Sequence, residues 1–282
     1  MTPLRQAGLA RLALVAAAAA VVSAQSRGGT PTVPQLLQAA GKYVAEYDKK
    51  FSAVVSEEKY DQTATQPGFR VQQRRTLVSD VILINAGAAG WISLRDVFQV
   101  DGSPVRDHTD RLLKLLTNPA PDAYQQALRL AQEGARFNIG NLSRSINVPS
   151  TALRFVRQDT QSRSTFEFNG LKTVNALSVA ELGFKETGTP RMIRTPADAP
   201  AEGKIWLEPA TGRIVQTELS VKFEKGSSAK ITVHYAAEPK ISLWVPVRMD
   251  EIYTLATGQT ISGRADYRNF RMFSVDVNTI IK

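Results

Sequence analysis

The chain has 282 residues, a formal net charge of +9 at pH 7 and no cysteine. The absence of cysteine excludes disulfides, thiolate catalysis and cysteine-type zinc sites, and it leaves no acceptor for a lipid. No Pro/Gly/Ser linker and no fixed-period repeat divides the chain after its first residues, which favours one large domain.

The N-terminus has the layout of a cleavable secretory signal. Arg5 and Arg11 precede the apolar run 12–22, and Ser23-Ala24-Gln25 follows it. The run is well short of the roughly 20 residues that a permanent membrane span needs. We therefore expect a signal peptide over 1–24, a flexible lead over 25–33 and one domain over 34–282. The expected product is soluble, not lipidated, without a permanent membrane span, and located in the bacterial periplasm or outside the cell.

The first part of the domain predicts one helix and three strands. Apolar residues from Pro34 to Phe51 recur at three-to-four spacing, which is typical of an amphipathic helix that packs on a sheet. Strands are expected near residues 52–60, 70–84 and 90–100. Asp101-Gly102 after the third strand is a hairpin signal.

From Asp107 onward the pattern becomes helical. Short helices are expected at the start of this segment, near 122–137 and near 150–156. Residues 107–157 are therefore interpreted as a helical insertion that lies over the concave side of the sheet.

The C-terminal part reads as consecutive antiparallel strands. After strands near 165–168, 177–185 and 203–207, apolar and polar residues alternate with period 2, as a half-buried strand requires. The residues predicted to share the apolar face of one strand are Val215, Thr217, Leu219, Val221 and Phe223. The same alternation returns near 231–235 and 243–249. We expect an α+β fold that is mainly antiparallel β.

Several C-terminal segments resemble a known family. They are 205–215 (IWLEPATGRIV), 230–235 (KITVHY), 243–246 (LWVP) and 266–271 (DYRNFR). Their order is similar to that of the periplasmic LolA/LolB/RseB-like superfamily and of uncharacterised secreted bacterial proteins with the same tail. The resemblance implies a strongly curved sheet, an unclosed barrel, with helices packed on its concave face. It also implies a hollow that receives acyl chains or a lipoprotein segment.

Aromatic residues on the predicted strands are the candidate ligand contacts. They could line an apolar hollow, or they could fill an ordinary core. Two arginines could meet an anionic headgroup at the rim. The candidate ligand-binding residues are Trp91, Trp206, Phe223, Tyr235, Trp244, Met249, Tyr253, Arg191 and Arg194.

The sequence shows no catalytic or metal-binding constellation. His108 and His234 have no partner at a metal-ligand spacing, and no cofactor or metal is expected. The neighbouring acids Glu57-Glu58 and Asp250-Glu251 are predicted to point to opposite faces of their strands and are interpreted as surface charges. A hydrolase would need His108 to meet a serine and a carboxylate in the folded chain.

These features predict a non-enzymatic binding protein for a hydrophobic or lipidic ligand held between the sheet and its helices. The alternative is an envelope protein-interaction or sensor module with a fully packed core, which would use an exposed strand edge or the helices. Expected partners are a lipid or acyl chain, or an envelope protein. Nucleic acid is not expected after export. The positive charge favours anionic envelope molecules or is a solvated surface.

Overall fold

The structure is a computed structural model. It describes residues 29–51, 54–68, 71–85, 91–105, 111, 123–140, 144, 146–224 and 226–272. Pro31–Lys282 forms one compact unit. The expected signal peptide, most of the expected lead and His108 lie outside the described residues, as does the side chain of Trp91.

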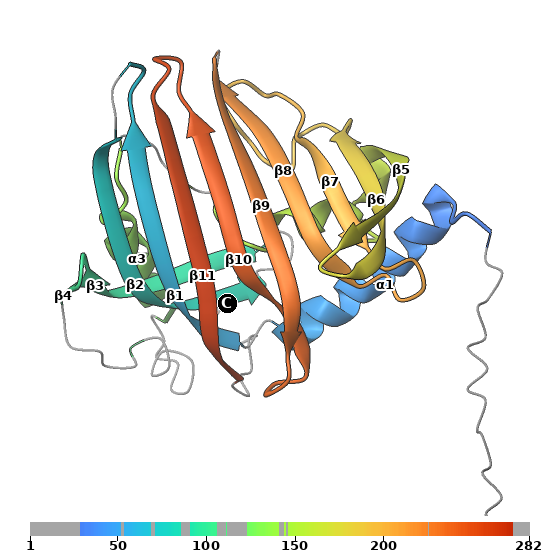
Figure 1. The fold of residues 1–282 in the computed structure, drawn as a ribbon, viewed down its shortest axis with the longest axis horizontal. Coiled ribbons are helices and arrows are strands. Elements are labelled where there is room, and N and C mark those ends of the chain that lie inside the picture. Colours follow the sequence, from blue (N-terminus) through green and yellow to red (C-terminus); the bar gives the residue numbers. More distant parts are fainter. Residues whose placement is uncertain are drawn as a thin grey trace, which may run out of the picture. The chain divides into compact units, whose positions relative to one another are not determined.

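One antiparallel sheet of 11 strands dominates this unit, in the order β4-β3-β2-β1-β11-β10-β9-β8-β7-β6-β5 (Figure 1). The sheet is open, and its two edges are β4 and β5. The strands are β1 (Val54–Thr65), β2 (Val71–Asn85), β3 (Trp91–Val100), β4 (Ser103–Pro104), β5 (Ser164–Val174), β6 (Leu177–Glu186), β7 (Glu202–Leu207), β8 (Ile214–Glu224), β9 (Ser227–Glu238), β10 (Leu243–Thr254) and β11 (Thr260–Met272).

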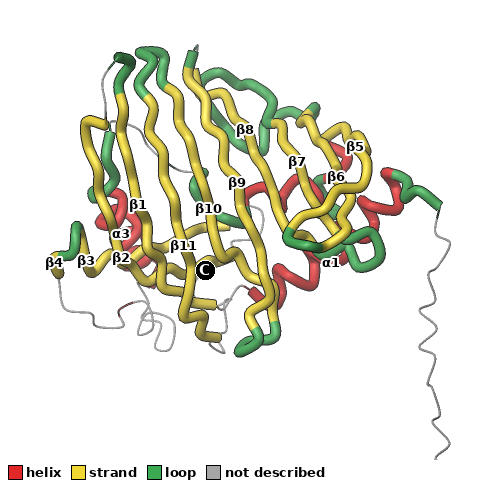
Figure 2. The backbone as a smooth tube through the Cα atoms, viewed as in Figure 1, coloured by secondary structure: helices red, strands yellow, loops and turns green. Residues whose placement is uncertain are grey.

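The mainly antiparallel class is confirmed, but the expected strong curvature is wrong. The sheet is neither closed nor strongly curled. One of its faces is covered by helices and by an irregular segment (Figure 2). We call this the helix-covered face and the other the open face. Because that cover buries the apolar residues, the sheet does not need to wrap around itself to bury them.

Helix α1 (Val33–Phe51) confirms the helix expected from Pro34. The backbone N–H of Thr32 donates to Gln35 Oε1 at 2.9 Å, which satisfies a donor at the helix start. The buried side of α1 includes Leu36, Ala40 and Val44, which recur at helical spacing and pack into the main core.

Between β4 and β5 the structure describes one further α-helix and two short 3-10 helices. Helix α3 (Ala123–Ala135) lies near the expected position 122–137 and packs on β3, where a Cβ on Gly134 would meet Arg95 O at 2.8 Å. The helix expected near 150–156 is a 3-10 helix, η2 (Thr151–Val156). A second 3-10 turn, η3 (Gln161–Arg163), leads into β5. Residues 137–150 between α3 and η2 contain no regular helix where they are described. We call the described part of this stretch, residues 137–140, 144 and 146–150, the cover segment.

Turn chemistry sets the strand registers. Asp101 and Gly102 both have positive φ, and Val100 pairs with Ser103, so the predicted hairpin is confirmed. In the β7–β8 pair, Trp206 is opposite Gln216 while Leu207 is opposite Ile214, which leaves Val215 as the extra residue of a bulge. Val215 therefore packs on the open face, and the prediction that it shares a face with Thr217 is wrong.

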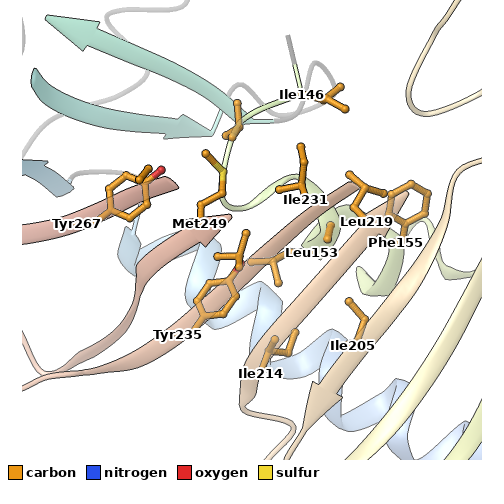
Figure 3. Close-up of a cluster of buried hydrophobic side chains, with 14 of the residues drawn as sticks. Ile146, Leu153, Phe155, Ile205, Ile214, Leu219, Ile231, Tyr235, Met249 and Tyr267 are labelled. Carbon is orange, nitrogen blue, oxygen red and sulfur yellow. The ribbon is translucent and has the colours of Figure 1, made fainter. Parts of the chain in front are cut away.

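One hydrophobic core fills the helix-covered face. It joins α1, the cover segment, η2 and strands from both halves of the sheet. Figure 3 shows part of it, with Ile146 of the cover segment, Phe155 of η2 and Tyr235 and Met249 of the sheet around one apolar cluster. The sheet therefore shares its core with its cover.

Candidate functional site

Charged residues lie inside the apolar layer between the sheet and the cover segment. Glu58 on β1 and Glu251 on β10 are buried, although the sequence pattern had suggested surface charges. Their neighbours Glu57 and Asp250 form ion pairs with exposed arginines on the open face. The prediction of opposite faces is thus confirmed, while the interpretation of all four as surface charges is wrong for two of them.

Glu251 is the centre of the first buried group. It accepts hydrogen bonds from the hydroxyls of Tyr60 and Tyr253, the latter at 3.0 Å. Arg144 of the cover segment lies 3.6 Å from Glu251, and both side chains are completely buried. The Arg144 guanidinium also donates to the Tyr60 hydroxyl and, at 2.7 Å, to Gln62 Oε1. A cation on the cover segment is therefore bound to an anion on the sheet.

Glu58 is the centre of the second buried group. Arg95 on β3 donates to both of its oxygens, at 2.7 and 3.0 Å, and Ser79 donates at 3.2 Å. The same guanidinium donates to the backbone carbonyl of Asn147 in the cover segment at 3.1 Å. The paired geometry is the strong form of an arginine–carboxylate contact.

The ring of Tyr60 connects the two groups. The guanidinium carbons of Arg95 and Arg144 lie 5.9 and 6.0 Å from its centroid. Burial raises the pKa of Tyr60 far above its ordinary value, and the Glu251 charge raises it further, so the hydroxyl keeps its proton. Burial also raises the pKa of Glu251, against the opposing effects of Tyr60 and Arg144. We call these residues, with Gln62, Ser79, Asn147 and Tyr253, the buried network.

The cover segment is therefore attached to the sheet by polar contacts as well as by apolar packing. Ile139 N–H donates to Gln62 Oε1 at 3.2 Å, and the Tyr235 hydroxyl donates to the Pro149 carbonyl at 2.6 Å. Arg144 Nε and Gln62 Nε2 are buried donors without a hydrogen-bond partner among the described residues. The attachment thus leaves hydrogen-bonding capacity unused at the interface.

Four of the predicted ligand-binding residues lie on the helix-covered face near this network. Tyr235, Met249 and Tyr253 are buried in the main core. Phe223 is partly buried against the same core, with its ring centroid 6.3 Å from that of Tyr253. The structure brings these four side chains under the cover.

The other predicted residues lie elsewhere. Trp206 belongs to a small cluster on the open face with Val179 and Val215. Trp244 packs against this cluster and against the main core, and the Arg213 guanidinium lies 4.4 Å above its ring.

The two predicted arginines lie in the loop between β6 and β7. Arg191 donates to the carbonyls of Gly188 and Asp198, which are in the same loop. Arg194 is an exposed residue of that loop. Arg191 thus holds the loop together.

Sequence reasoning missed the buried network, yet the pattern contains its signal. Glu58 is two residues before Tyr60, and Glu251 lies between Met249 and Tyr253 at the same spacing. Period-2 alternation therefore places both carboxylates in phase with the apolar side of their strands. Arg144 gives no such signal, because it lies in an irregular segment.

His234 lies on the open face as its strand pattern predicted, with Nε2 3.9 Å from Asp250 Oδ2. Burial lowers its pKa, against the opposing effect of Asp250. Within the described ranges, no group of three or more His, Asp or Glu side chains converges to hold a metal ion. No helix in that part of the chain has the length and apolar character to cross a membrane.

Comparison with solved structures finds matches at low sequence identity. A domain assigned to outer membrane lipoprotein sorting from Vibrio parahaemolyticus covers 87% of this chain and 98% of its own, with TM-score 0.41 and 13% identity. A DUF1329 family protein from Desulfovibrio piger covers 90% and 98%, with TM-score 0.42 and 12% identity. A LolA superfamily protein from Nitrosomonas europaea covers 90% and 99%, with TM-score 0.34 and 10% identity.

No protein-family model matches the chain, and no curated protein matches it in sequence. The resemblance to the LolA superfamily noted in the sequence is thus found among solved structures. Those likenesses concern the fold, and the function has to be argued from the residues of this chain.

Proposed function

We propose that this chain is a non-enzymatic binding protein of the bacterial envelope. It holds a hydrophobic or lipidic ligand on the helix-covered face, between the sheet and the cover segment. The observation that carries the proposal is the attachment of the cover segment to an apolar sheet face through buried ion pairs.

The physical basis is the small net stabilisation that buried ion pairs provide. The free energy lost when two charged groups are desolvated nearly offsets the free energy gained from their attraction. A contact made by such pairs can therefore be separated at a modest cost in free energy, provided that water reaches both charged groups. Opening the cover segment would hydrate Arg144 and Glu251 and would expose Tyr235 and Met249. An acyl chain that covers these residues gains roughly 0.8 kcal/mol for each buried CH₂.

The polar end of the ligand also has partners in this region. Arg144 Nε and Gln62 Nε2 are donors without described acceptors. An ester or carboxylate oxygen next to an acyl chain accepts hydrogen bonds and donates none, so it is complementary to these two groups. Phe223, Tyr235, Met249 and Tyr253 are the proposed apolar contacts.

A disulfide that locks the cover segment tests the proposal. A Cβ on Gly140 would lie 2.4 Å from Cδ1 and 3.4 Å from Cγ1 of Ile261, so the two positions are direct neighbours, and Ile261→Cys removes the closer contact. The strain of a side chain at the positive φ of residue 140 is present in both redox states of the variant. The chain has no other cysteine. The variant Gly140→Cys/Ile261→Cys should bind a fluorescent fatty acid when reduced and lose at least about tenfold in affinity when oxidised. The reduced form of the same variant is the matched control for both substitutions.

Native mass spectrometry of protein purified from a periplasm is the complementary measurement. Copurified lipid that is absent from the oxidised variant would support the proposal. Equal fatty-acid binding by the oxidised and reduced forms would contradict it, as would a protein that binds no lipid in either form.

The free edge of the sheet favours a second candidate function, an envelope protein-interaction module. Strand β5 ends the sheet, and its Leu171 is 55% exposed. Unpaired strand edges can add a strand from a partner. Recovery of one stoichiometric protein without lipid in a pull-down, lost on Leu171→Lys, would favour this function.

A further inference from the structure

A separate recess lies on the open face, on the side of the sheet opposite the cover segment. Its cavity volume is about 460 Å³, within the range of small-molecule sites. Residues of β8, β9 and β10 form its floor, and the loop between β6 and β7 contributes one wall. The lining residues are Lys185, Ala199, Pro200, Glu202, Ser220, Val221, Lys222, Ser228, Ala229, Lys230, Ile252 and Thr254. We call this the open-face recess.

Strand register places the recess side chains in two neighbouring rows. Ser220 is opposite Lys230, which is opposite Ile252. In the next row, Lys222 is opposite Ser228, which is opposite Thr254. Each row therefore combines a lysine with hydroxyl or aliphatic neighbours on one surface.

Lysines dominate the charge of this recess. Three lysines and one carboxylate, that of Glu202, line it. Lys230 pairs with Glu218 at 2.8 Å, but the lysine side chain is 54% exposed, so water screens that pair. Lys185 and Lys222 are exposed and belong to no ion pair among the described residues. An anion between Lys222 and Lys230 would reduce the repulsion between two like charges on one face.

The recess also has an apolar side. Ile252 is 49% exposed, although its row is otherwise polar. Ala199 and Pro200 line the recess from the loop. A ligand with an aliphatic part would therefore remove Ile252 from water while its charged end contacts the lysines.

The loop wall is already in place in this structure. Ala197 N–H donates to the Phe223 carbonyl at 2.8 Å, and the Thr195 hydroxyl donates to the Lys222 carbonyl at 2.9 Å. The buried carboxylate of Glu186 accepts hydrogen bonds from the N–H groups of Met192 and Ala201. Because these hydrogen bonds already fix the loop in place, a ligand spends little binding free energy on ordering it.

We propose that the open-face recess binds a small amphiphilic anion, with one phosphate or carboxylate head and a short aliphatic body. Lys185, Lys222 and Lys230 contact the head, Ser220, Ser228 and Thr254 supply hydroxyl groups, and Ile252 contacts the body. This site is independent of the ligand proposed under the cover segment, because the two lie on opposite faces of the sheet.

Titration of the isotope-labelled protein with hexyl phosphate, followed by amide NMR shifts, tests the site. We expect saturable shifts confined to the recess strands and the loop. Lys185→Gln/Lys222→Gln should weaken binding at least fivefold. The control Lys172→Gln/Lys240→Gln removes the same charge from exposed positions outside the recess and should leave the Kd within twofold.

Two further experiments distinguish the contacts with the anionic head of the ligand from those with its aliphatic body, and the open-face recess from the site proposed under the cover segment. Ile252→Thr should weaken hexyl phosphate at least threefold and leave inorganic phosphate unchanged. The oxidised Gly140→Cys/Ile261→Cys variant should still bind hexyl phosphate. The site is refuted if both lysine double variants lose affinity equally, if hexyl phosphate binds no better than inorganic phosphate, or if the shifts are not localised.

Discussion

Glu58 and Glu251 are the most completely buried carboxylates among the described residues. A charged group in an apolar layer is tolerated only when it is paired and hydrogen-bonded. Glu58 has Arg95, and Glu251 has Arg144 with two tyrosine hydroxyls. Each pair joins secondary elements that are distant in sequence, and the pair with Arg144 joins the sheet to the cover segment. At this scale, the pairing explains how strands with an apolar side accommodate charge.

The ion pair under the cover segment predicts a strong coupling between its two members. Arg144→Met leaves Glu251 buried without its cation and should reduce the free energy of unfolding by about 3–5 kcal/mol. Combining it with Glu251→Gln removes both charges, so the loss in the double variant should be at least about 1 kcal/mol smaller than the sum of the single losses. Urea unfolding followed by circular dichroism measures all three.

The open face provides the control for that cycle. Arg264 pairs with Asp250 at 2.7 Å, but its side chain is 56% exposed. Arg264→Met should therefore change the free energy of unfolding by less than about 1 kcal/mol. Additive losses from Arg144→Met and Glu251→Gln would contradict the coupling proposed for the buried pair.

At the scale of elements, the contact between α1 and the β7–β8 turn is unusually close. Gly212 has positive φ, and a Cβ there would lie 2.1 Å from the backbone oxygen of Ala39 in α1. The turn residue therefore has to be glycine for two reasons, the left-handed backbone and the proximity of the helix. This contact places the helix against the sheet.

Gly212→Ala should therefore reduce the free energy of unfolding by about 2–5 kcal/mol, because left-handed strain adds to displacement of the helix backbone. Gly102→Ala is the matched control, since Gly102 also has positive φ but nothing lies within 4 Å of its added Cβ. Gly102→Ala should reduce the free energy of unfolding only by the strain of the left-handed backbone, about 1–2 kcal/mol. Equal losses in chemical unfolding would show that the approach of α1 does not matter.

At the scale of the whole molecule, the described domain has two different sheet faces. The helix-covered face contains one core that joins α1, the cover segment and nearly all the strands. The open face contains ion pairs such as Arg248–Asp266 and Lys204–Glu181, with the small Trp206 cluster at one end. The two proposed ligand sites follow this division, an acyl chain on one face and a small anion on the other.

A single shared core predicts cooperative unfolding. The main cluster contains α1 together with strands from both halves of the sheet, so the two halves share their largest apolar contact. Unfolding in urea should therefore give coincident transitions by far-ultraviolet circular dichroism and by tryptophan fluorescence. Separate midpoints, with part of the sheet persisting after the fluorescence change, would contradict the prediction.

Local patterns predicted the elements better than their assembly. The strands from Ile214 to Met272 and the helix from Pro34 follow their periodicity, because the face on which a side chain lies depends on its position along its own strand or helix. The bulge at Val215 could not be predicted, since it arises from the register between β7 and β8. The ligand-contact set illustrates the same limit: Tyr235 and Met249 are near each other under the cover, whereas Trp206 lies on the other face.

The amino-acid order by itself determined the antiparallel class, the amphipathic helix, the turn at Asp101-Gly102 and the lack of cysteine chemistry. Tertiary structure alone decided that Glu58 and Glu251 meet arginines, that the sheet stays open and that lysines of separate strands line one recess. The reason is physical: periodicity is a property of neighbouring residues, whereas the pairing of a buried charge depends on groups more than 30 positions away.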